Sequence, residues 1–161
     1  MADILPAEAV KARILGIKAA PQGTSLDHAN VEWVEIRVDL NSDLANWRVA
    51  HLRPLWREEV AKPIEWEWIY TFGSPHFAGA GEVYRVHSGS LVRAAMHPVP
   101  DDLAPGRKHV YANGPVGAAR LLWQRGDYAR LVDAFGTVID EVVVWPDAAP
   151  GARREAEGAR R

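Results

Sequence analysis

The sequence predicts an all-β protein in which about seven to nine short strands pack as a β-sandwich. Segments with apolar residues at every second position recur along the chain, and loops rich in Gly, Pro, Asp and Asn separate them. Segments with helical periodicity are almost absent. With 161 residues, of which 48% are hydrophobic, the chain has the length and composition of one domain with a core of its own.

Residues 31–40 give the clearest strand, since Val34, Ile36 and Val38 fall on one face and Glu35 and Arg37 on the other. Alternation over 12–19 places Leu15, Ile17 and Ala19 together in the same way. In 64–72 one face would carry five large side chains, those of Ile64, Trp66, Trp68, Tyr70 and Phe72. Further strands are expected over 44–52, 82–88, 109–112, and in a final hairpin of 127–133 and 137–145.

Three regions divide the chain. Residues 1–10 form an N-terminal leader, 11–145 the sandwich, and 146–161 a flexible tail that lacks large apolar residues. Two long connections, 53–63 and 89–108, interrupt the strands; we expect each to be a binding loop or a lid that packs on its own domain. In the first, the helical spacing of Leu52, Leu55, Trp56 and Val60 predicts a short helix over 55–62, with Pro54 at its start and Pro63 at its end.

Composition excludes several functions. The chain has no cysteine, which removes disulfides, thiol catalysis and cysteine-ligated metal sites. A net charge of −2 disfavours general binding to nucleic acid. No apolar run is long enough to span a membrane, and no signal peptide is visible, so a cytoplasmic or virion-associated protein is expected.

No candidate for catalysis or metal binding stands out. Asp39, Asn41 and Asp43 have the spacing that opens a calcium loop, but Leu44 and Ala50 occupy positions where such a loop needs glycine and an acid. The six histidines are scattered, and no serine lies in a Gly-x-Ser-x-Gly motif. We therefore expect no catalytic residue, no metal ligand and no cofactor.

The seven tryptophans supply the candidates for core and interface. Core packing is expected for four of them: Trp47, Trp66, Trp68 and Trp123. Trp33 shares a face with charged residues and Trp56 lies in the 53–63 connection, so both are candidates for an interface, where tryptophan is enriched. For Trp56 the alternative is that it caps an open end of its own sandwich. Leu55 and the acidic pair Glu65 and Glu67, which we expect to face solvent or a basic partner, complete the candidate interface.

The order of these segments resembles the lamin-tail domain family. Five blocks carry the resemblance: NVEWVEI from Asn30 to Ile36, LANWRV from Leu44 to Val49, Tyr70 with Phe72, GEVYRV from Gly81 to Val86, and WQRGDYARLVDAFGTVID from Trp123 to Asp140. The resemblance implies an immunoglobulin-like β-sandwich that serves as a binding or structural module, because the family has no catalytic residues to carry over. The connections 53–63 and 89–108 are longer than the family's pattern.

Three functions compete. The first is a protein–protein interaction module, as a homo-oligomer or with another protein, in an assembly such as a virion or a decorated capsid. The second is an accessory nucleic-acid-binding domain of the lamin-tail type, which the net charge disfavours. The third is an enzyme whose site is built from the long loops, for which the sequence offers no residues.

Overall fold

A computed structural model describes residues 10–53, 66–114 and 121–144 of the chain. They form ten strands in three sheets, which confirms the expected all-β class. One four-stranded sheet has the order β1 (Ala12–Lys18), β2 (Trp33–Val38), β7 (Val83–His87), β8 (Lys108–Tyr111). The other has the order β10 (Val138–Val143), β9 (Tyr128–Val132), β4 (Arg48–Leu52), β5 (Glu67–Thr71). Two short strands, β3 (Ser42–Asp43) and β6 (Phe77–Ala78), pair separately.

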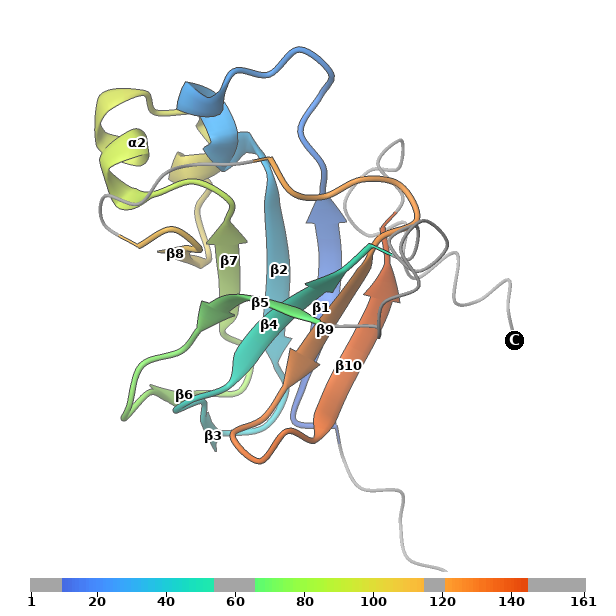
Figure 1. Ribbon diagram of the computed structural model, residues 1–161. Coiled ribbons are helices and arrows are strands. Elements are labelled where there is room, and N and C mark those ends of the chain that lie inside the picture. Colours follow the sequence, from blue (N-terminus) through green and yellow to red (C-terminus); the bar gives the residue numbers. More distant parts are fainter. Residues whose placement is uncertain (1–9, 54–65, 115–120, 145–161) are drawn as a thin grey trace, which may run out of the picture.

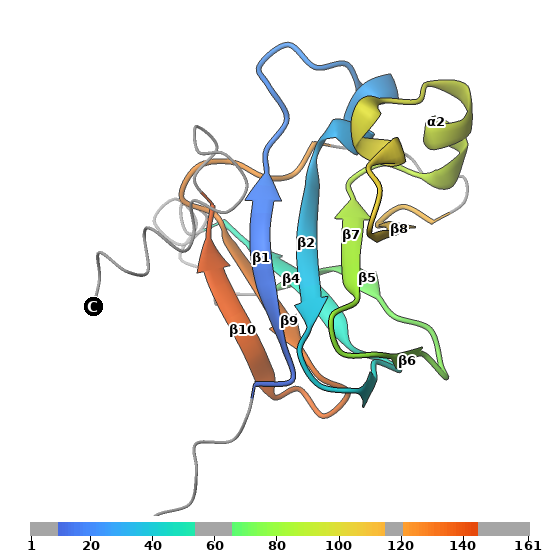
Figure 2. The ribbon, with the colours of Figure 1, turned by 180° about the vertical axis from the view of Figure 1, so that it is seen from behind.

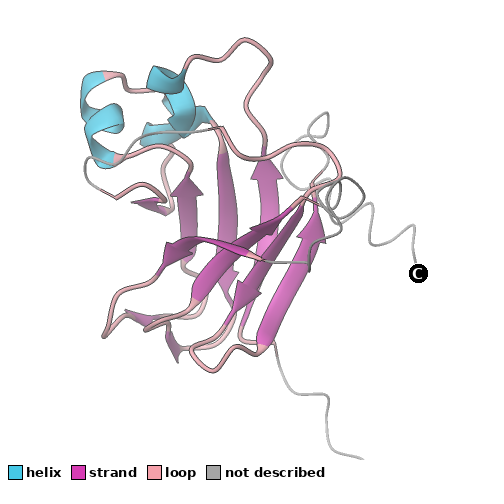
Figure 3. Cartoon of the chain, viewed as in Figure 1, coloured by secondary structure: helices cyan, strands magenta, loops and turns pink. Residues whose placement is uncertain are grey.

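The two larger sheets face each other, with β1 beside β10 along one side (Figures 1 and 2). Three short helices lie together at one end of the first sheet, and β3 and β6 lie at the opposite end (Figures 1 and 3). These helices are η1 (Leu26–Val31), α2 (Leu91–Met96) and η2 (Pro100–Leu103). No helix in the described parts of the chain is long and apolar enough to cross a membrane.

The core lies between the two sheets. Val34, Ile36 and Val38 of β2 are buried there, as the alternation in 31–40 predicts. Trp47 and Trp123 are each 4% exposed, so the core positions expected for these two tryptophans are confirmed.

A β-bulge changes the inward face of β1. The register with β2 shifts between Ile14 and Gly16, so that Leu15 is an extra residue. Ile14 is buried on one side of the bulge and Ile17 on the other, while Leu15 is only half-buried. The single face expected for Leu15, Ile17 and Ala19 is therefore wrong, because strict alternation cannot continue through an inserted residue.

A second bulge has a larger effect in β5. Val49 pairs with Tyr70 and Ala50 with Trp68, which leaves Ile69 as the extra residue. Phe72 is buried, but Trp68 is 50% exposed and Trp66 is half-buried. The core positions expected for Trp66 and Trp68 are therefore wrong, because the bulge turns this half of the strand outward.

Trp33 is not exposed, and its expected place at an open interface is also wrong. Its side chain is 2% exposed, and its indole Nε1 donates to Asp101 of η2 at 2.8 Å. The Arg85 guanidinium carbon lies 3.9 Å from the centre of the Trp33 ring. The reason is that 89–108, expected to be a loop, contains α2 and η2, and η2 covers this outer side of β2 and β7.

Several expectations lie outside the described residues. They are the helix over 55–62, the interface candidates Leu55, Trp56 and Glu65, the leader up to residue 9, and the tail 146–161.

One buried carboxylate joins the ends of several strands. Glu32 is 1% exposed and accepts hydrogen bonds from the backbone N–H of Ala20, the Ser88 hydroxyl and the backbone N–H of Leu122. Burial raises the pKa of Glu32, and these bonds, with another from the backbone of Trp123, oppose that rise.

Replacing Trp47 or Trp123 by alanine should lower the free energy of unfolding by about 3–5 kcal/mol, because each substitution leaves a large cavity in the core. Denaturant titration measures this. Leu103→Ala, at a residue that is 75% exposed, is the control and should change the free energy by less than about 0.5 kcal/mol. Losses below about 1 kcal/mol for both tryptophans would contradict their place in the core.

Glu32→Gln should also destabilise the fold. A glutamine amide has one acceptor oxygen, so some of the N–H and O–H groups that point at Glu32 lose their acceptor, at a cost of about 1–3 kcal/mol each. The matched control is Glu141→Gln, which breaks only a partly exposed ion pair with Arg130 and should cost at most about 1 kcal/mol. Equal effects of the two substitutions in denaturant titrations would show that Glu32 is not a structural acceptor.

Candidate functional site

The outer face of the β10–β9–β4–β5 sheet combines tryptophan and arginine side chains. Trp68 and Arg130 both pair across strands with Ala50, so the three side chains lie in one row on the same face. The guanidinium carbon of Arg130 lies 3.9 Å from the centre of the Trp66 ring, and that of Arg48 lies 4.9 Å from the centre of the Trp68 ring. We call these four residues, Arg48, Trp66, Trp68 and Arg130, the Trp–Arg face.

Among the described residues, one of the two arginines of this face has an ion-pair partner and the other has none. Arg130 forms an ion pair with Glu141 at 2.9 Å. Arg48 is exposed, and no carboxylate in the described parts of the chain forms an ion pair with it. The Trp–Arg face therefore presents a half-exposed indole ring next to a cation that has no anionic partner there, which suits a ligand or partner with an apolar group and an acid.

The interface candidate Glu67 lies elsewhere than expected. It pairs across strands with His51, and its Oε1 is 3.6 Å from His51 Nδ1. Its side chain is 34% exposed. The structure therefore places the partly exposed Glu67 against a buried histidine, and its expected contact with a basic partner stays a prediction.

His51 and Asp127 form a buried pair that has the residue types of a catalytic dyad. Their Nε2 and Oδ2 atoms are 2.9 Å apart, and both side chains are at most 2% exposed. Burial raises the pKa of Asp127, but hydrogen bonds from His51, Arg53 and the backbone of Gln124 outweigh this and lower it. Because the imidazole is fully enclosed and also packs edge-on against Trp123 at 5.2 Å, the pair fixes the start of β9 and cannot reach a substrate.

In the acidic turn from residue 39 to 43, the side chains form ion pairs and hydrogen bonds within the chain. Asp39 forms ion pairs with Arg13 and Arg37, both at 2.8 Å. The Asn41 side chain accepts from the backbone of Ala80, and the Asp43 carboxylate accepts from the backbones of Ala45 and His76. Within the residues that the structure describes, no group of three or more histidine and acidic side chains could hold a metal ion.

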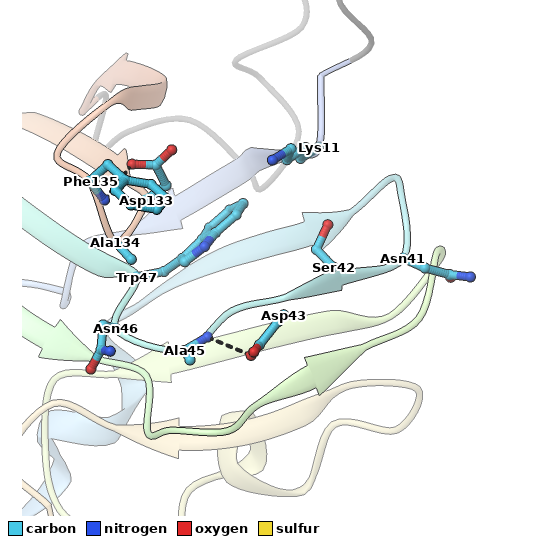
Figure 4. Close-up of a pocket in the computed structure, with 10 residues that line it drawn as sticks. All are labelled: Lys11, Asn41, Ser42, Asp43, Ala45, Asn46, Trp47, Asp133, Ala134 and Phe135. Carbon is cyan, nitrogen blue, oxygen red and sulfur yellow. Dashed lines mark hydrogen bonds between the residues drawn. The ribbon is translucent and has the colours of Figure 1, made fainter.

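An open pocket of about 510 Å³ lies at the end of the sheets nearest β3 (Figure 4). The turn between β9 and β10 forms one side through Asp133, Ala134 and Phe135, and the segment from Asn41 to Asn46 forms the other (Figure 4). Phe135 is 94% exposed at the tip of its turn, and sequence reasoning gave no signal for it beyond its position between strands. Among the described lining residues the one hydroxyl, that of Ser42, donates to the backbone of Leu40 and is not activated as a nucleophile.

The structure thus places several of the predicted site residues elsewhere than the sequence predicted. Trp66 and Trp68, expected in the core, form the exposed Trp–Arg face, whereas Trp33, expected at an interface, is buried beneath η2. Arg48 and Arg130 were not predicted. Each arginine lies beside apolar residues of its own strand, and the sequence does not show that it shares a face with Trp66 and Trp68. The bulge at Ile69 decides this.

No protein-family model matches the chain, and no curated protein matches it.

Dialysis against a strong chelator should leave the melting temperature unchanged, because Asp39, Asn41 and Asp43 already bind arginines and backbone N–H groups of their own chain. Thermal unfolding before and after dialysis, followed by back-titration with Ca²⁺, measures this. A drop in the melting temperature that Ca²⁺ restores would show a structural metal site.

Proposed function

We propose that this protein is a non-enzymatic interaction module with an immunoglobulin-like β-sandwich of the lamin-tail type. The order of the five sequence blocks supports this family, and so does the place of their residues. Glu32 of the first block and Trp123 of the last block are buried together, and Trp47 of the second block lies in the same core as Trp123.

The observation that carries the proposed function is the half-exposed Trp68 beside Arg48. Tryptophan and arginine are the residues most often found at the energetic centres of interfaces, since both bury a large contact area and arginine also pairs with acids. The 53–63 connection, with Leu55 and Trp56, joins β4 to β5 and so begins and ends at strands of this sheet. We propose that this segment, with Glu65, contributes to the same interface.

The partner is another copy of the chain or a second protein of an assembly, such as a virion or a decorated capsid, in the cytoplasm or in the particle. We propose no cofactor.

A second candidate function has one observation in its favour. Arginine and tryptophan side chains on an open sheet face are also the elements that stack the bases of single-stranded nucleic acid. The net charge of −2 opposes it. Fluorescence anisotropy with a labelled oligonucleotide at increasing salt separates the two functions, because binding to phosphates weakens steeply with salt.

Trp68→Ala should weaken self-association while leaving the monomer as stable as before. Removing a side chain that is half exposed should change the free energy of unfolding by less than about 1 kcal/mol, whereas an interface tryptophan contributes about 2 kcal/mol or more to binding. Analytical ultracentrifugation over a range of concentrations measures association, and Leu103→Ala, on η2, is the matched exposed control.

We expect the wild type and Leu103→Ala to associate alike, and Trp68→Ala to remain monomeric at concentrations where they associate. A wild type that is monomeric at every concentration would overturn self-association. Equal association of all three proteins would place the interface away from the Trp–Arg face.

A further inference from the structure

Two histidines meet edge to edge beside the short helices. His87 Nε2, on β7, lies 2.8 Å from His109 Nδ1, on β8. The ring planes are only 20° apart, and the ring centres are separated by 5.1 Å. The ring centres are thus much farther apart than the two nitrogens in contact. The rings therefore lie nearly in one plane, as in an N–H···N hydrogen bond, and are not stacked face to face.

The other nitrogen of each ring faces a backbone carbonyl. His87 Nδ1 is 2.8 Å from the carbonyl oxygen of Asn30, and His109 Nε2 is 2.9 Å from that of Ala104. A carbonyl oxygen can only accept a hydrogen bond, so both of these nitrogens must carry hydrogen. In a neutral imidazole the remaining nitrogen then holds a lone pair and no hydrogen. Two neutral rings would therefore direct two lone pairs at each other across 2.8 Å, which is repulsive.

We propose that the His87–His109 pair is a buried proton-binding site, which holds one additional proton between His87 Nε2 and His109 Nδ1. The four ring nitrogens then carry three hydrogens, which make three hydrogen bonds: one to Asn30, one to Ala104 and one between the rings. The pair as a whole carries one positive charge.

The environment assigns this proton to His109. His87 is fully buried, and its pKa is lowered to about 4, mainly by burial; His109 and Arg85 add to the lowering, while the hydrogen bond to Asn30 and the charge of Asp101 oppose it. His87 is therefore the neutral acceptor. His109 is partly exposed and donates from both of its nitrogens.

Charged groups of several elements surround the pair, and Asp102 lies beside His87. The Asp102 carboxylate of η2 is 2% exposed, its Oδ1 lies 3.9 Å from His87 Nδ1, and no lysine or arginine in the described chain pairs with it. Asp101 is bound to Lys18, and Glu35 is bound to both Arg85 of β7 and Arg107. The remaining neighbour on β8, Tyr111, lies parallel to His87 with ring centres 5.1 Å apart and donates to Asp102 at 3.4 Å.

The proton joins four parts of the chain: η1 through Asn30, β7, β8, and the link from η2 through Ala104. Its release would leave one of the three hydrogen bonds unmade. Because β8 is the edge strand of its sheet and, among the described strands, pairs with β7 alone, the attachment of β8 should weaken as the pH rises past the point of release.

Nitrogen-15 NMR of the imidazole rings in the whole protein tests the proposal without a variant. At neutral pH we expect three of the four ring nitrogens to carry hydrogen, and a scalar coupling between His87 Nε2 and His109 Nδ1 across the hydrogen bond. Two rings with one hydrogen each, and no coupling, would overturn it.

Hydrogen exchange tests the consequence with a matched variant. In His109→Asn the side-chain amide can still donate to His87 but cannot titrate in this range. After correction for intrinsic exchange rates, protection of the β8 amides in the wild type should fall about tenfold on raising the pH past proton release, since a charged hydrogen bond is lost. The variant should show no such fall. Equal pH dependence of β8 protection in both proteins would also overturn the proposal.

Discussion

The fold depends on the hydrogen bonds that the buried carboxylate of Glu32 accepts. An ionised acid in the interior is costly unless hydrogen-bond donors surround it, and here the donors come from segments far apart in the sequence. Ala20 follows β1, Ser88 follows β7, and Leu122 lies on the approach to β9 in the opposite sheet. The acid can be buried only when these segments are all in place, so its burial couples the two sheets at the end where the helices lie.

The bulges decide which side chains the molecule shows to solvent. At Ile69 one extra residue moves Trp66 and Trp68 from the core face to the outer face, where arginines of β4 and β9 cover their rings. Sequence periodicity detects the strand but not the extra residue, because a bulge depends on the partner strand as much as on its own residues. The exposed aromatic surface was therefore not predictable from the 64–72 segment alone.

Where alternation was uninterrupted, the sequence predicted the structure well. The inward face of β2 and the burial of Trp47 and Trp123 followed from local pattern and motif position, and the final hairpin formed as predicted despite a register shift between Val138 and Asp140. The prediction for Trp33 failed for a different reason. Its face is polar by sequence, yet Arg85 binds both Glu35 and the backbone carbonyl of Asp101 in η2, and polar groups that have partners can be covered. Ser90, which caps α2, and Pro100, in the first turn of η2, were local signals in 89–108 for helices there.

The cover formed by η2 makes the molecule one-sided. Over β2 and β7 the outer surface of the first sheet is already occupied by the chain itself, so that, among the described strands of the two larger sheets, the aromatic face open to solvent belongs to the second sheet. A contact between two copies through that single face is satisfied by a two-fold arrangement, in which each copy uses the same surface. Such an arrangement closes on itself, and growth into a filament or a lattice would need a separate surface of different chemistry.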